Sequence, residues 1–183
     1  PSQNGQRLTV CFSTQVGCPM QCAFCATGKE GFTRNLLPGE ICDQILLVQD
    51  DFQKRVTNIV GMGQGEPFLN YDNTLKALEI INDPKVIGIG ARHITLSTCG
   101  IIPKIHEFSN VKEQFTLAVS LHSAIQSTRD SLMPKVSQYN LEELKDSLVA
   151  YVEATGRRVT LEYAMMRGVN DTNEHLKALI SFC

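Results

Sequence analysis

The chain has 183 residues, 43% of them hydrophobic, which suits a single domain with its own core. Its net charge of −2 gives no overall basic character, so a nucleic-acid partner would have to contact local basic patches. No stretch approaches the roughly 18 apolar residues of a membrane span, and none has the pattern of a signal peptide. Seven cysteines, three of them in one short segment, favour a metal site in a reducing cytoplasm over a disulfide-rich secreted domain.

Predicted strands and helices alternate along the chain. Short β-branched and aromatic segments predict strands at 7–13, 57–62, 92–98, 115–121 and 158–165. Helical periodicity and end signals predict helices at 38–50, 72–81, from about 102, 127–132, 140–155 and 172–182. Asp72 is expected to cap the second helix, while Asn140 with Glu143 forms a capping box that starts the longest one, and Gly156 ends it.

This alternation predicts an α/β fold with a parallel sheet covered by helices. Two architectures fit the pattern, an open doubly wound sheet or an arc of a β/α barrel with five βα units. In both, ligand sites gather at the carboxyl ends of the strands. Small and polar residues follow every predicted strand at that end, such as the turn at 63–67 and the segments 97–100 and 120–123. A site is therefore expected where these segments meet.

Cys18, Cys22 and Cys25 stand at C-x3-C-x2-C spacing in one loop after the first strand. Three thiolates suit zinc or an iron–sulfur cluster. Structural zinc normally takes four ligands, often from two separate pairs, and no second pair is present. Three packed core cysteines are a poor explanation beside Gly17 and Pro19. A [4Fe–4S] cluster with one open iron is therefore the favoured reading, with zinc as the alternative.

With Phe24 before its last cysteine, this loop resembles the signature of radical S-adenosylmethionine (SAM) enzymes. Longer strings resemble one branch of that superfamily, the adenine C2 methyltransferases of large-subunit ribosomal RNA and transfer RNA. These strings are CFSTQVGC at 11–18, CAFCATG at 22–28, GFTRNL at 31–36, GMGQGEPFLNYDN at 61–73, TLSTCG at 95–100, AVSLH at 118–122, LMP at 132–134 and GVND at 168–171. The resemblance covers nearly the whole chain.

The resemblance implies an enzyme with a partial (β/α) barrel of the radical SAM type, with 1–183 as its core domain. The family's sixth strand, an N-terminal acidic proton acceptor, a small RNA-binding domain and the methyl-accepting cysteine have no counterpart in these 183 residues. Cys183 does not match the motif of that cysteine. The chain is thus expected to be the core of a longer enzyme, able to bind the cluster without completing methyl transfer.

The resemblance also assigns roles to individual residues. Cys18, Cys22 and Cys25 would hold a [4Fe–4S] cluster whose open iron binds SAM. Further SAM contacts would come from Gly65, Glu66, Ser97, Ser120, Leu121 and His122. The reaction would methylate C2 of adenine in 23S rRNA and tRNA through a methyl-cysteine intermediate. Cys11 would be the second catalytic thiol, which releases the protein–RNA adduct, although from the residues alone Cys11 is more simply a buried strand cysteine.

The implied partners are the RNA substrates and an electron donor such as flavodoxin, for a cytoplasmic monomer without membrane contact. Alternatives are the C8-methylating relative, another radical SAM enzyme or glycyl-radical activase, and a zinc or electron-transfer module.

Lys29 and Arg34, beside the cluster loop, are the best candidates to contact RNA phosphate. The glycines at 61, 63 and 65 are expected to let the backbone approach a ligand. Residues expected in the interior are Cys42, Cys99, Met62, Met165 and Met166.

Overall fold

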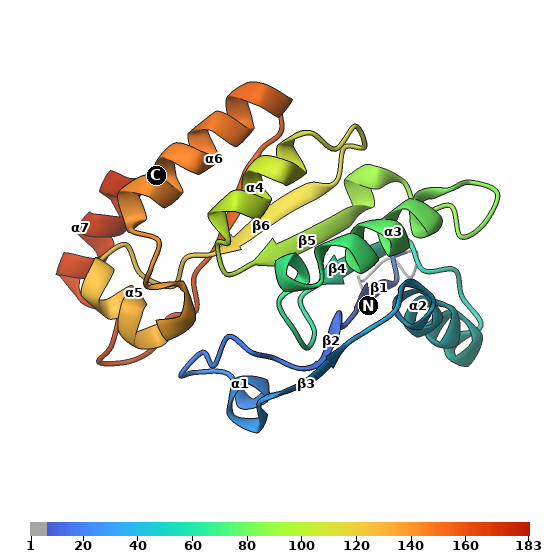
Figure 1. Cartoon of the computed structure of the whole chain (residues 1–183), viewed down its shortest axis with the longest axis horizontal. Coiled ribbons are helices and arrows are strands. Elements are labelled where there is room, and N and C mark those ends of the chain that lie inside the picture. Colours follow the sequence, from blue (N-terminus) through green and yellow to red (C-terminus); the bar gives the residue numbers. More distant parts are fainter. Residues whose placement is uncertain (1–6) are drawn as a thin grey trace.

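The computed structural model of the chain describes residues 7–183 and is built on a five-stranded parallel sheet (Figure 1). The strands lie in the order in which they occur along the chain: β1 (Thr9–Cys11), β4 (Asn58–Gly61), β5 (Ile94–Thr98), β6 (Thr116–Ser120) and β7 (Val159–Glu162). A doubly wound sheet reverses its strand order at a switch point, whereas sequential order is that of a β/α barrel. The α/β prediction is confirmed, and of its two architectures the barrel arc is the one observed.

Six of the helices within residues 7–183 follow the strands along the chain, and most of them lie against the sheet (Figure 1). They are α2 (Pro38–Phe52), α3 (Tyr71–Asn82), α4 (Ile102–Ser109), α5 (Gln126–Leu132), α6 (Leu141–Thr155) and α7 (Asn173–Phe182). Short 3₁₀ turns occupy Pro67–Leu69, Ala91–His93 and Pro134–Val136. In Figure 1, α2, α3, α4 and α6 lie along one face of the sheet, while α5 lies beyond the arrowheads of β5 and β6. The helix α5 is thus at the carboxyl ends of the strands.

The helix ends explain where two of the predictions succeeded and one failed. The capping box of Asn140 and Glu143 is present at the start of α6, and Gly156 ends that helix in the left-handed conformation. The predicted cap at Asp72 is wrong, because α3 already begins at Tyr71 and Asp72 lies in its first turn. Asn70 occupies the cap position, and its side-chain Nδ2 donates instead to the carbonyls of residues 14 and 36.

Three short elements between residues 15 and 35 were not anticipated. β2 (Gln15–Gly17) and β3 (Phe32–Asn35) form an antiparallel hairpin, and α1 (Ala26–Glu30) lies between them. Elements of three to five residues are too short for hydrophobic periodicity to show. Gly17 allows the hairpin, since its φ is +76° and a Cβ there would collide with the carbonyl of Gly31. The hairpin closes the loop that carries the three cysteines.

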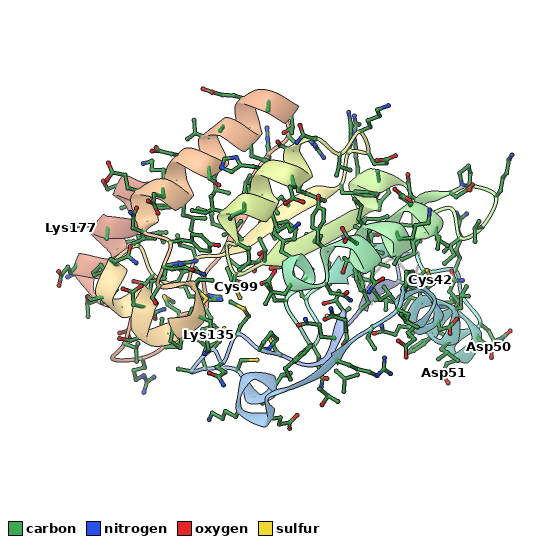
Figure 2. All side chains as sticks on the ribbon, viewed as in Figure 1. Cys42, Asp50, Asp51, Cys99, Lys135 and Lys177 are labelled. Carbon is green, nitrogen blue, oxygen red and sulfur yellow. The ribbon has the colours of Figure 1, made fainter. Side chains whose placement is uncertain are left out.

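The core lies between the sheet and its helices. Phe108 of α4 stacks on Tyr151 of α6 at 6.2 Å between ring centroids. Cys42 is buried between α2 and α3, as expected of a core residue (Figure 2). Met62 and Met165 were wrongly expected in the interior, because 40% and 79% of their surfaces are exposed. Within residues 7–183 no helix is both long and apolar enough to cross a membrane.

Candidate functional site

The cysteine loop is fixed to the body of the protein by backbone hydrogen bonds. Cys18 N donates to Gly31 O at 2.8 Å, which ties the loop to the end of α1. Cys25 N donates to Cys22 O at 3.1 Å, and helix α1 follows directly. On the other side, Ala23 N donates at 2.9 Å to the carbonyl of Leu132, at the end of α5. The loop is therefore held against the carboxyl ends of the strands.

One cavity of about 260 Å³ lies between this loop and the strand ends. It is lined by Cys18, Cys22, Phe24, Cys25, Thr27, Gly61, Met62, Gly63, Gly65, Glu66, Ser97, Thr98, Cys99, Ser120, His122, Met133 and Glu162. The cavity thus joins residues from the loop and from four of the five strand ends. All three predicted cluster ligands and five of the six predicted SAM contacts are brought together here.

The three predicted cluster thiols line the same cavity. Among residues 7–183, no three His, Cys, Asp or Glu side chains are grouped as ligands of a single ion. A [4Fe–4S] cluster takes each thiolate on a different iron, so its ligands lie around the cluster. Three soft thiols around one cavity are a donor set that such a cluster can use.

Cys99 is a fourth thiol in this cavity, although the sequence predicted it in the core. Figure 2 shows Cys99 between the strand ends, α5 and the cysteine loop. Hydrogen bonding with the Cys22 thiol and burial raise the pKa of Cys99, and the same hydrogen bond lowers the pKa of Cys22. Burial raises the pKa of Cys18 to about 11. The segment 97–100 was expected at the site, but the Cys99 side chain was assigned to the core because it follows an apolar strand.

Glu66 is a buried carboxylate at the end of the turn after β4. Only 1% of its surface is exposed, and burial raises its pKa. Oε1 accepts the N–H of Phe68 at 2.9 Å and Oε2 accepts the N–H of Cys99 at 2.7 Å. Each carboxylate oxygen has a further lone pair, so Glu66 can still accept from a ligand. An ammonium group in the cavity would give this buried charge a counter-ion.

The glycines before Glu66 are in tight contact with another segment of the chain. A Cβ at Gly63 would lie 2.7 Å from the carbonyl oxygen of Phe12, and one at Gly65 would lie 2.6 Å from Cβ of Gln15. Gly65 also has a φ of +103°. Gln15 Oε1 accepts the N–H of Glu66 at 2.8 Å, which fixes the turn. Gly63 and Gly65 are therefore required because a Cβ at either position would collide with residues 12–15, which pack directly against the turn.

His122 follows β6 and faces the cavity with its ring against Phe24. The two rings meet edge to face at 4.6 Å between centroids. Burial, and then the positive charge of Arg129, lower the pKa of His122 to about 4, so the ring is neutral at neutral pH. Nδ1 accepts the N–H of Ala164 at 3.0 Å. A backbone N–H can only donate, so the ring proton is on Nε2, which can donate to a ligand.

Two residues assigned by the resemblance, Leu121 and Cys11, and the basic residue Arg34 need separate comment. The side chain of Leu121 is fully buried and does not line the cavity, and its N–H already donates to Glu162 O. Cys11 is exposed at the end of β1 and is likewise not part of the lining. Arg34, a candidate for RNA phosphate, forms a two-point ion pair with Glu40 at 2.8 Å. The residues of the lining that the sequence did not single out for this site are Thr27, Met62 and Met133, whereas Thr98 and Cys99 belong to the segment 97–100 that was expected there.

Comparison with known proteins shows the family of the chain. The sequence profile of the radical SAM superfamily matches residues 12–183. The chain belongs to the radical SAM superfamily. The predicted cofactors of this radical SAM domain, a [4Fe–4S] cluster and SAM, are those of the superfamily. Three thiols and a buried carboxylate in one cavity are a donor set that fits both groups.

The radical SAM domain is also similar to individual curated and solved proteins. It is 57% identical over 169 residues to a probable dual-specificity RNA methyltransferase RlmN of Nostoc punctiforme, covering 92% of this chain and 46% of that protein. The corresponding protein of Clostridium novyi is 51% identical, with 94% and 50% covered. A crystal structure of a radical SAM methyltransferase from Sphaerobacter thermophilus superposes with a TM-score of 0.93 at 42% identity, covering 97% of this chain and 53% of that one. The chain spans about half the length of the curated relatives it matches.

Proposed function

We propose that this chain is the cluster- and SAM-binding core of an RNA methyltransferase that acts on C2 of adenine in 23S rRNA and tRNA. The observation that carries the proposal is the single cavity in which Cys18, Cys22, Cys25 and Glu66 meet. The choice of RNA as substrate is supported by relatives about half identical to this chain that are named dual-specificity RNA methyltransferases. The cluster, when bound, supplies the electron for reductive cleavage of the SAM sulfonium.

The residues of the chain divide the binding tasks by their chemistry. Thiolates of Cys18, Cys22 and Cys25 hold three irons of the cluster. Glu66 accepts a hydrogen bond from the amino group of SAM, and this contact is strong because both groups are charged and the site is buried. His122 and Ser120 can donate to oxygens of the carboxylate or ribose. Phe24 holds the His122 ring in place and covers it from solvent.

The cellular setting is part of the same proposal. Every described cysteine is a free thiol, which suits a reducing cytoplasm. An electron donor such as flavodoxin would reduce the cluster, and the enzyme would act as a monomer. Cys11 would serve as the resolving thiol. Its exposed position at the carboxyl end of β1 leaves the thiol accessible to an RNA adduct.

The cofactor half of the proposal is tested on the chain itself. After anaerobic reconstitution with iron and sulfide, the protein should turn brown, and SAM should shift its absorption. With dithionite, it should then release 5′-deoxyadenosine and methionine. A protein that stays colourless under these conditions would contradict the cluster assignment and favour the zinc alternative.

The RNA half is tested on the source protein that contains this chain. The protein is incubated with 23S rRNA or tRNA transcripts and SAM, and digested nucleosides are compared with 2-methyladenosine and 8-methyladenosine standards. The proposal expects 2-methyladenosine in both RNAs. 8-Methyladenosine would assign the protein to the C8-methylating relatives instead, and unmethylated RNA with intact SAM cleavage would point to another radical SAM reaction.

A further inference from the structure

Arg129, on α5, is a charged side chain buried as completely as the hydrophobic core. It is 1% exposed. One guanidinium nitrogen, Nη2, donates to the carbonyl of Cys99 at 2.7 Å and, more weakly, to that of Ser120 at 3.5 Å. Nε has no hydrogen-bond partner at all. A guanidinium stays charged in proteins, and burying it is costly unless an anion lies near it.

No carboxylate of the chain pairs with this charge. The ion pairs among residues 7–183 join other residues, and residues 1–6 contain no acidic side chain. Glu66 is a buried carboxylate that also contacts Cys99, but it accepts the N–H of Cys99 while Arg129 donates to the Cys99 carbonyl. Asp130, the next residue on α5, accepts from Gln126 at 2.7 Å. The guanidinium therefore lacks a counter-ion in direct contact.

The neighbours of Arg129 belong to the cysteine site. Arg129 donates to the carbonyl of Cys99, and Cys99 lines the cavity together with Cys22. The carbonyl of Leu132, one turn further along α5, accepts the N–H of Ala23 in the cysteine loop. Arg129 does not itself line the cavity. It contacts the wall of the cavity through the backbone carbonyls of two lining residues, Cys99 and Ser120.

We propose that Arg129 is the buried counter-charge of the iron–sulfur cluster and that it raises the cluster's reduction potential. This inference rests on the proposed function, because it needs the cluster to be held by Cys18, Cys22 and Cys25. A cluster with three thiolate ligands is an anion, and reduction adds one more negative charge. A fixed positive charge nearby stabilises the reduced state more than the oxidised state. Arg129 is thus a positioning residue whose effect on the reaction passes through the cluster.

The test compares reduction potentials of reconstituted variants by anaerobic redox titration, followed by electron paramagnetic resonance of the reduced cluster. Arg129→Met and Arg129→Gln remove the positive charge. Arg129→Lys keeps the positive charge but replaces the planar guanidinium by a single ammonium group. Arg157→Met is the matched control. Arg157 also donates to backbone carbonyls, those of Val111, Glu113 and Phe115, but at the amino end of β6, away from the cavity.

We expect the ratio of reduced to oxidised cluster, at a fixed ambient potential, to fall at least tenfold in Arg129→Met and Arg129→Gln. For a one-electron couple this is a shift of about 59 mV to more negative potential. Arg129→Lys should lie between these variants and the wild type. Arg157→Met should leave the potential unchanged even if its melting temperature falls, which separates an electrostatic effect from a structural one.

An unchanged potential in Arg129→Met or Arg129→Gln, with the cluster present, would overturn the proposal while leaving the proposed function intact. If both neutral variants fail to fold, Arg129→Lys decides: because it keeps the charge, its potential should stay closer to the wild-type value than to the shift of about 59 mV expected for loss of the charge, and a shift of that size would overturn the proposal. An equal shift in Arg157→Met would also overturn it. Wild-type protein that takes up no cluster would overturn this inference together with the proposed function.

Discussion

Glu66 and Arg129 bind opposite groups of the same residue, Cys99. The Cys99 N–H donates to Oε2 of Glu66 at 2.7 Å, and the Cys99 carbonyl accepts from Nη2 of Arg129, also at 2.7 Å. Both side chains are 1% exposed. One peptide segment at the end of β5 thus separates a buried negative charge that faces the cavity from a buried positive charge behind it. Glu66 lines the cavity, whereas Arg129 does not.

Glu66→Gln should weaken SAM binding roughly 10- to 100-fold, because a hydrogen bond to a charged group is worth about 1.5–3 kcal/mol. The dissociation constant is measured from the absorption change of the reconstituted cluster. Since burial raises the pKa of Glu66, wild-type affinity should also fall as the pH drops, beginning above the usual titration range of glutamate. Glu79→Gln, an exposed surface change, is the control. Equal affinities of Glu66→Gln and wild type would remove Glu66 from the SAM site.

His122 should make the stability of the cluster-free protein depend on pH between about 6.5 and 4. The folded state lowers the pKa of His122 to about 4, so the unfolded state binds more protons in this window. The stabilisation is therefore complete above pH 6.5 and is lost as the pH falls toward 4, by about 3 kcal/mol at most. Urea unfolding at several pH values measures it.

The matched control for that measurement is His106→Gln, on the exposed surface of α4. This variant should keep the wild-type pH profile, whereas His122→Gln should flatten it in the same window. Comparing variants also cancels the contribution of Glu66, whose raised pKa acts in the opposite direction. Parallel profiles for wild type and His122→Gln would mean that His122 is not held neutral by the fold.

Gly63→Ala should destabilise the protein by about 1–3 kcal/mol, the typical cost of overpacking. The added Cβ would lie 2.7 Å from both the carbonyl of Phe12 and the hydroxyl of Ser13, and the carbonyl cannot move without disturbing β1. Thermal melts of the cluster-free protein measure the change. Gly39→Ala is the matched control, because nothing lies within 4 Å of its Cβ and it is in a helix. We expect that variant to be neutral or slightly stabilised.

The three ligand cysteines should differ from the other thiols in a reconstitution experiment. Alanine at Cys18, Cys22 or Cys25 should abolish the brown colour, because each would leave one iron without a ligand. Cys11→Ala should keep the brown colour, because Cys11 lies outside the cavity lining. Cys99→Ala should also keep it, because Cys99 is not one of the three cysteines at C-x3-C-x2-C spacing. Loss of colour in Cys99→Ala would make the fourth thiol of the cavity a ligand. Loss in Cys11→Ala would contradict the division between cluster thiols and a resolving thiol.

Much of this protein was predictable because the signals are local. Hydrophobic patterns of about ten residues predicted the alternating strands and helices, and Asn140 with Glu143 marked the start of α6. The spacing of Cys18, Cys22 and Cys25 pointed to a cluster, since three soft ligands in one loop have few other uses. Glu66 and His122 were assigned only through the family resemblance, because a glutamate after a glycine turn or a single histidine has no specific meaning alone.

The tertiary structure decided which distant segments meet. The sequential strand order, which selects a barrel arc, depends on pairing between strands that are some twenty to fifty residues apart in the chain. Cys99 became part of the cavity, and Arg129 became a buried charge, through contacts that no local pattern encodes. Hydrophobic periodicity shows which face of a helix or strand is apolar. The position of the Arg129 side chain relative to the cysteine loop depends instead on how the helices and strands pack together. For that reason the cysteine spacing and the family resemblance predicted the cofactor from the sequence, and only the fold revealed that the buried charge of Arg129 contacts Cys99.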